Sequence, residues 1–180
     1  GSSAVQFALM WWLASQTNSG TVLSIAGLFA FLPQLIIGPF AGVWVDRMDK
    51  KKVVIIADLF TGLVALFLSL SIIVTEPQIT FILISLFLRA VASVFHTPAI
   101  QAIVPTLVPV DELVEANSWN QFLQSGAYML GPVVGAILYS VVPLWVVLLS
   151  DTLGAIIACS IIGKIKIKNI TVTGEVTPYF

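Results

Sequence analysis

Long apolar stretches separated by short polar segments run through almost the whole chain. Between positions 21 and 45 there is no charged residue, and the stretches that follow carry at most one or two charges in their interiors. A helix needs about 20 mostly apolar residues to cross the hydrocarbon core of a bilayer. The pattern therefore predicts an all-α integral membrane protein. The expected helices cover residues 3–16, 21–45, 53–74, 79–104, 111–141 and 144–163.

These helices suggest one domain and a tail. We expect residues 1–168 to form a six-helix transmembrane domain, in which the first helix is truncated because its apolar stretch is shorter than a full span. Residues 169–180 are polar and are interpreted as a cytoplasmic tail or linker. Pro33, Gly38 and Pro39 in the second helix predict kinks or close helix contacts, because proline removes a helical hydrogen bond and glycine has no side chain.

Composition excludes several classes of protein. Hydrophobic residues make up 58% and charged residues 9% of the chain, whereas soluble domains have about 25% charged residues. The net charge of −1 does not favour nucleic acid as a partner. One cysteine and one histidine do not make a metal site. The chain has neither a phosphate-binding glycine loop nor a nucleophile motif, so we expect no enzyme, no cofactor and no metal.

Basic residues predict the orientation in the membrane, because loops rich in lysine and arginine stay on the cytoplasmic side. Arg89 is the only basic residue inside a predicted span. The other seven follow the second and sixth helices: Arg47, Lys50, Lys51, Lys52, Lys164, Lys166 and Lys168. The loops on the opposite side contain none. Both termini are therefore expected to be cytoplasmic.

Three charged residues lie deep inside predicted spans, away from the helix ends, namely Arg89, Asp58 and Asp151. An arginine at the middle of a span costs about 2.5–3.5 kcal/mol on insertion scales, so it normally faces a counter-charge or water. Arg89 is expected either to pair with one of the two aspartates or to line a water-filled cavity. Each aspartate is equally a candidate for proton coupling or for a structural ion pair, because a carboxyl group in a low dielectric can bind a proton.

Polar side chains also occur inside apolar helices. In the fourth helix, Arg89 shares one face with Ser85, Ser93 and His96, because the four residues recur at helical spacing. Four further polar residues are candidates for lining a cavity, with hydrogen bonding between helices as the equal alternative: Gln34, Asn117, Gln121 and Gln124. Tyr128, near the same face of the fifth helix, and Gln6 of the first helix are candidates of the same kind.

The segment after the second helix resembles a known motif. Gly42, Asp46, Arg47, Lys51 and Lys52 have the spacing of the loop between helices two and three of the major facilitator superfamily. The family's second glycine is replaced here by Asp49, and we expect this change to be tolerated because aspartate can adopt left-handed backbone angles. The resemblance implies a cytoplasmic latch. The alternative is an ordinary basic flank of a spanning helix.

A second motif lies in the fifth helix. Gly131, Pro132 and Gly135 resemble the antiporter signature of facilitator exporters, although its first glycine falls one place early, at Gly126, and its last is Ala136. The alternative is tight helix packing, which needs only small residues at the contact.

Residues 4–168 together resemble the N-terminal half of the macrolide-efflux branch of this superfamily. The resemblance implies a six-helix bundle built as a 3+3 inverted repeat, in a bacterial plasma membrane, that exports lipophilic drugs in exchange for protons by alternating access. The implied partners are the lipid bilayer, a lipophilic small molecule, protons and a second six-helix half. Two alternatives remain: a facilitator importer of a small metabolite, and a non-transporting membrane fragment that needs a partner bundle.

Overall fold

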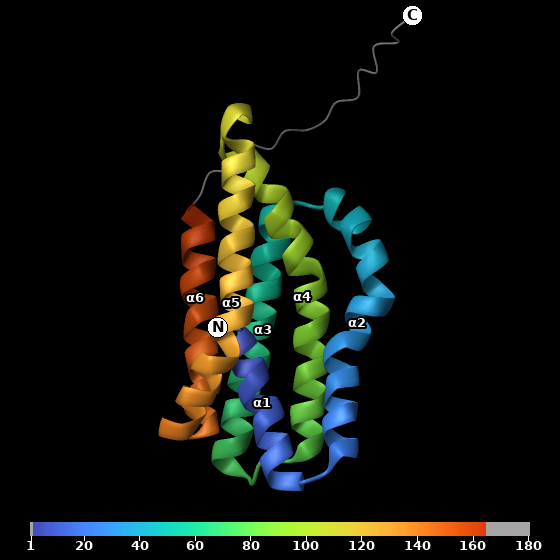
Figure 1. Cartoon of the computed structure of the whole chain (residues 1–180), viewed down its shortest axis with the longest axis vertical. Coiled ribbons are helices and arrows are strands. Elements are labelled where there is room, and N and C mark those ends of the chain that lie inside the picture. Colours follow the sequence, from blue (N-terminus) through green and yellow to red (C-terminus); the bar gives the residue numbers. More distant parts are fainter. Residues whose placement is uncertain (1, 165–180) are drawn as a thin grey trace, which may run out of the picture.

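The computed structural model describes residues 2–164, which form six α-helices with no strand in that range (Figure 1). The helices are α1 (Ser2–Thr17), α2 (Gly20–Asp46), α3 (Lys50–Val74), α4 (Ile79–Leu107), α5 (Leu113–Val141) and α6 (Leu144–Lys164), with a 3-10 turn η1 (Val110–Glu112) before α5. All except α1, which has 16 residues, are long and apolar enough to cross a membrane. The all-helical membrane fold is thus confirmed. The predicted tail, with Lys166 and Lys168, lies outside the described residues.

The helix α3 begins at Lys50, three residues earlier than predicted, because Asp49 caps it. The Asp49 side chain accepts a hydrogen bond from the backbone N–H of Lys52 at 3.3 Å, which satisfies one of the free donors of the first turn. Asp49 has φ −68° and ψ 102°, an extended conformation. The expectation that Asp49 replaces the motif glycine by adopting left-handed angles was therefore wrong.

The connection between α4 and α5 also differs from the prediction. α4 continues through Pro105 to Leu107, since a proline in the last turn removes only one hydrogen bond of the helix. After Pro109 the chain forms a 3-10 turn, in which the N–H of Glu112 donates to the carbonyl of Pro109 at 3.1 Å. α5 therefore begins at Leu113 rather than at Asp111.

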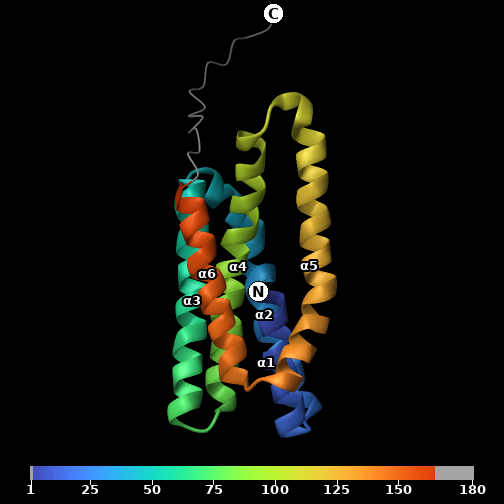
Figure 2. The ribbon, with the colours of Figure 1, turned by 90° about the vertical axis from the view of Figure 1, so that its left-hand side faces the viewer.

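Small residues allow a close helix contact between α3 and α6. A Cβ on Gly62 would lie 2.8 Å from the Cβ of Ala155, and the hydroxyl of Thr152 donates to the carbonyl of Gly62 at 3.1 Å. α4 packs against both α2 and α3, and α5 packs against α1. Among the described residues, α5 has one buried residue, Gly135, in its C-terminal half. Figure 2 shows the N-terminal half of α5 standing apart from α3 and α6.

Two apolar clusters fill the bundle. One is built mainly on α1, α3, α4 and α6, with Ala26 of α2, and includes Leu9 and Leu148. The other joins α2, α3 and α4 through residues such as Val45, Val54 and Ile103. Along α4 the first cluster ends at Leu86 and the second starts at Ala99. Arg89, Ser93, His96 and Thr97 of α4 lie between them.

The charged connections gather at one end of the bundle. The α2–α3 and α4–α5 connections lie at the same end as the last turn of α6, and the other three connections lie at the opposite end (Figures 1 and 2). Arg47, Lys50, Lys51, Lys52 and Lys164 are therefore together at what we call the basic end. Of the described basic residues, Arg89 alone lies elsewhere.

Candidate functional site

A buried ion pair joins α4 to α6. Nη1 of Arg89 lies 2.7 Å from Oδ2 of Asp151, and each side chain is 6% exposed. Neither Nη atom of Arg89 makes a hydrogen bond of regular geometry within the described residues, so the contact rests on charge. A charge buried at this depth is stable only beside an opposite charge. Of the two aspartates that the sequence left open as partners of Arg89, the structure selects Asp151.

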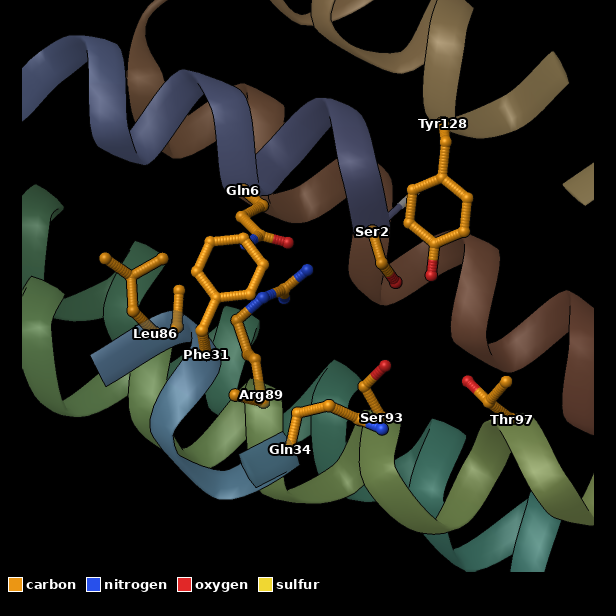
Figure 3. A pocket seen from close by; sticks show the side chains of 11 residues that line it. Ser2, Gln6, Phe31, Gln34, Leu86, Arg89, Ser93, Thr97 and Tyr128 are labelled. Atoms are coloured by element: carbon orange, nitrogen blue, oxygen red, sulfur yellow. The ribbon is translucent and has the colours of Figure 1, made fainter. Parts of the chain in front are cut away.

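The same arginine also lines a cavity of about 260 Å³. Figure 3 shows the hydroxyl groups of Ser93, Thr97 and Tyr128 pointing into the space beside Arg89, with the amide of Gln6 and the ring of Phe31 close to its guanidinium. The lining comes from α1, α2, α4 and α5: Ser2, Gln6, Ala30, Phe31, Gln34, Leu86, Ala90, Ser93, Thr97 and Tyr128 surround it together with Arg89. A space that combines aromatic rings, amides and one cation suits an amphiphilic ligand.

The four cavity candidates of the sequence do not share one site. Gln34 lies in the Arg89 cavity, whereas Asn117 and Gln121 line an open hollow of about 860 Å³ along α5. The amide nitrogen of Gln124 lies 3.4 Å from the side-chain oxygen of Asn120, as a donor within α5. Tyr128, Ser93 and Thr97 complete the Arg89 cavity. The polar stripe of α4 predicted Ser93, but Thr97 was missed, although it lies one turn further along the same face.

His96 and Asp58 form a second pair, between α4 and α3, which is an ion pair when the imidazole is protonated. The imidazole Nε2 lies 3.2 Å from Oδ1 of Asp58, and the side chains are 35% and 21% exposed. The sequence did not reveal this pair. The one feature of the sequence that could have predicted it is that the two residues lie at similar distances from the basic end, on neighbouring helices.

The latch motif makes contacts only within this end of the bundle. Arg47 follows α2, and its backbone N–H donates to the carbonyl of Trp44 at 3.1 Å. Lys51 reaches α6, where its ammonium donates to the carbonyl of Gly163 at 2.8 Å. A Cβ on Gly42 would meet no atom within 4 Å. Within residues 2–164, neither Asp46 nor Arg47 takes part in an ion pair.

Two glycines of the antiporter-like motif meet α1. A Cβ on Gly131 would lie 2.5 Å from the Cβ of Ser3, and a Cβ on Gly135 would overlap the carbonyl oxygen of Ala4. A Cβ on Gly126, in contrast, would meet nothing within 4 Å. Pro132 lies within the helix between the two contacts. These glycines therefore allow the close approach of α5 to α1, as small residues do in membrane bundles.

Comparison with known proteins places this geometry in a family. Residues 1–168 match the model of the Major Facilitator Superfamily. Macrolide efflux protein A of Streptococcus pyogenes is 38% identical over 169 residues, which are 94% of this chain and 42% of that protein. The protein of the same name from Enterococcus faecalis is 39% identical over 153 residues, or 85% of this chain and 47% of that protein.

A more distant relative is the staphyloferrin A transporter of Staphylococcus aureus, which is 27% identical over 137 residues, or 76% of this chain and 34% of that protein. No solved structure matches the chain. The chain spans less than half the length of these relatives. Because a family model covers nearly all of its helical part and efflux proteins align with almost its full length, the chain belongs to the Major Facilitator Superfamily of membrane transporters.

Proposed function

We propose that this chain is one six-helix half of a proton-coupled transporter that exports lipophilic drugs such as macrolides. The observation that carries the proposal is the buried Arg89–Asp151 pair, which lies beside a cavity lined by aromatic and polar groups. A membrane protein keeps charge in its interior mainly for transport or coupling. The efflux proteins aligned with the chain support outward transport and macrolides as the substrate class.

The size of the cavity supports a site shared with a second bundle. About 260 Å³ is below the range of about 300–1,000 Å³ for pockets that hold drug-sized ligands. α2 and α5, which both contribute to this cavity, also expose large apolar side chains such as Leu35, Phe122 and Met129. A second six-helix half would complete the cavity, and lipid would cover the remaining apolar surface.

The helix pairs support a 3+3 inverted repeat. In such a repeat α1 corresponds to α4, α2 to α5 and α3 to α6. The contact between α2 and α4 then has its counterpart in the contact between α5 and α1, and the contact between α3 and α6 is its own counterpart. Both sets of contacts are present. Repeats of this kind rock as rigid bodies around a site near the bilayer midplane, which is the alternating access proposed here.

The basic end supports the orientation. Five described basic residues lie there and none lies at the opposite end, so we place the basic end and both termini in the cytoplasm of a bacterium, with the bundle in the plasma membrane. The Gly42 to Lys52 segment would act there as a latch. The open space beside Gly42 would receive a helix of the second half.

Transport of a fluorescent lipophilic dye tests this function. Vesicles with this chain alone are compared with vesicles in which it is co-expressed with the C-terminal half of a macrolide-efflux relative. We expect dye to move outward, driven by a proton gradient, only when both halves are present. Movement that is inward would identify an importer, and no movement with both halves present would indicate a non-transporting fragment. Either result overturns the proposal.

A further inference from the structure

A second cavity connects the two ion pairs of the bundle. It has a volume of about 160 Å³ and lies between α3 and α6, lined by Ser2, Asp58, Thr61, Asp151, Gly154 and Ala155. This volume is ample for water, which needs only about 10–15 Å³ of accessible space. Asp58 and Asp151 therefore line the same cavity, although each belongs to a different pair.

The two pairs differ in depth and in exposure. At 1.5 Å per residue, about 12 Å of helix separates Asp58 from Lys50, and about 20 Å separates Asp151 from Lys164. The outer pair has side chains that are 35% and 21% exposed, for His96 and Asp58, whereas both side chains of the inner pair are 6% exposed. The outer pair is therefore more accessible to water than the inner pair.

The charged and titratable groups around these pairs are few. Asp58 is faced by His96 of α4 and by Asp151 and Cys159 of α6. Asp151 is faced by Asp58 of α3 and Arg89 of α4. Tyr128 of α5 lies across the Arg89 cavity. Neither α1 nor the membrane part of α2 has a charged residue.

We propose that His96, Asp58 and Asp151 form one coupled proton-binding site, whose occupancy decides whether Arg89 keeps its counter-charge. This inference rests on the proton coupling of the proposed function and assigns the site. A proton that binds the outer pair is passed through water in the second cavity to the carboxyl group of Asp151, at Oδ1, because Oδ2 is buried against Arg89, and no other bond forms or breaks. Once Asp151 is neutral, the buried guanidinium lacks a partner. Arg89 then turns toward the polar groups of its own cavity, such as Gln34 and Ser93.

The composition of the chain makes this directly measurable by NMR. His96 is the single histidine, and the chain has only two arginines, so that Arg47→Lys leaves Arg89 as the sole source of an arginine Nε–H signal. An arginine does not itself titrate. Any movement of its signal between about pH 5 and 8, where an unperturbed histidine titrates, therefore reports a change at its partner.

The experiment follows both signals in the full chain in lipid nanodiscs. We expect the Arg89 signal to move with pH, and the midpoint of this movement to shift by about one pH unit in Asp58→Asn and in His96→Gln, because coupled groups titrate as a unit. Glu76→Gln, at the opposite end of the bundle, is the matched control and should leave the midpoint unchanged. Circular dichroism confirms equal helix content.

A double variant tests the role of the inner pair, because Asp151→Asn alone would leave the charge of Arg89 buried without a partner. In Arg89→Gln/Asp151→Asn, the midpoint of the His96 imidazole signal should move, because Asp58 loses its neighbour. An Arg89 signal that ignores pH, or that moves equally in the parent and in Asp58→Asn, overturns the site. Proton-driven dye efflux with such an uncoupled Arg89 would leave the proposed function standing. If the Arg89 signal depends on Asp58 and His96 but no dye efflux is found, the proton-binding site stands and the proposed function is overturned.

Discussion

At the scale of single residues, the Arg89–Asp151 pair is the contact whose loss should cost the most. Both side chains are buried, so Asp151→Leu leaves an uncompensated guanidinium in the bundle. Removing one partner of a buried pair typically costs about 3–5 kcal/mol, whereas replacing both partners with apolar residues is often neutral. We therefore expect Asp151→Leu to lower the free energy of unfolding by about that amount, and Arg89→Leu/Asp151→Leu to restore it, as measured by denaturation in mixed micelles.

The same double variant separates stability from transport. When combined with a second half, it should be folded and inactive, since its charge is gone although its packing is kept. Full activity in the double variant would show that the pair serves structure alone.

Asp49 offers a second prediction at this scale. It occupies a glycine position of the family motif but caps α3 in an extended conformation. Asp49→Ala should therefore destabilise the protein by about 1 kcal/mol, and Asp49→Gly by only a few tenths, because glycine is a tolerable N-cap. The thermal midpoints of the two variants provide the comparison. A gain in stability for Asp49→Gly would contradict the capping role and favour a strained, left-handed aspartate.

At the scale of helices, α5 depends on α1 through its glycines. Gly135→Ala places a methyl group against the backbone of Ala4, and the helices must separate. Overpacking of this kind typically costs about 1–3 kcal/mol. Gly126→Ala adds the same methyl group to the same helix, but nothing lies within 4 Å of it. We expect only the Gly135 variant to lose stability and to make α5 more accessible to protease. Equal losses in both variants would mean that helix propensity rather than packing decides.

At the scale of the whole molecule, the sequence predicted the membrane spans, which depend on residues close together in the chain. It did not predict the ion-pair partners, which depend on which helices are adjacent in the bundle. The spans were clear because charged residues are rare within them. The partner of Arg89 stayed open between two aspartates, since both lie on other helices, and spacing along a chain does not say which helix is adjacent. The sequence placed His96 on the polar face of the fourth helix but not beside Asp58, because that pairing depends on the contact between α3 and α4.

The orientation of the bundle is a property of the whole molecule as well, and cysteine labelling tests it. In a Cys159→Ser background the chain has no other thiol, so one introduced cysteine is labelled alone. Met48→Cys lies at the basic end, and Glu76→Cys lies in the α3–α4 turn at the other. Because basic loops are held on the cytoplasmic side, a membrane-impermeant maleimide applied to intact cells should label Glu76→Cys. Met48→Cys should react only after the cells are opened. The reverse pattern would place the basic end outside and would remove the latch and the outer ion pair from the cytoplasmic side, where the proposed export mechanism requires them.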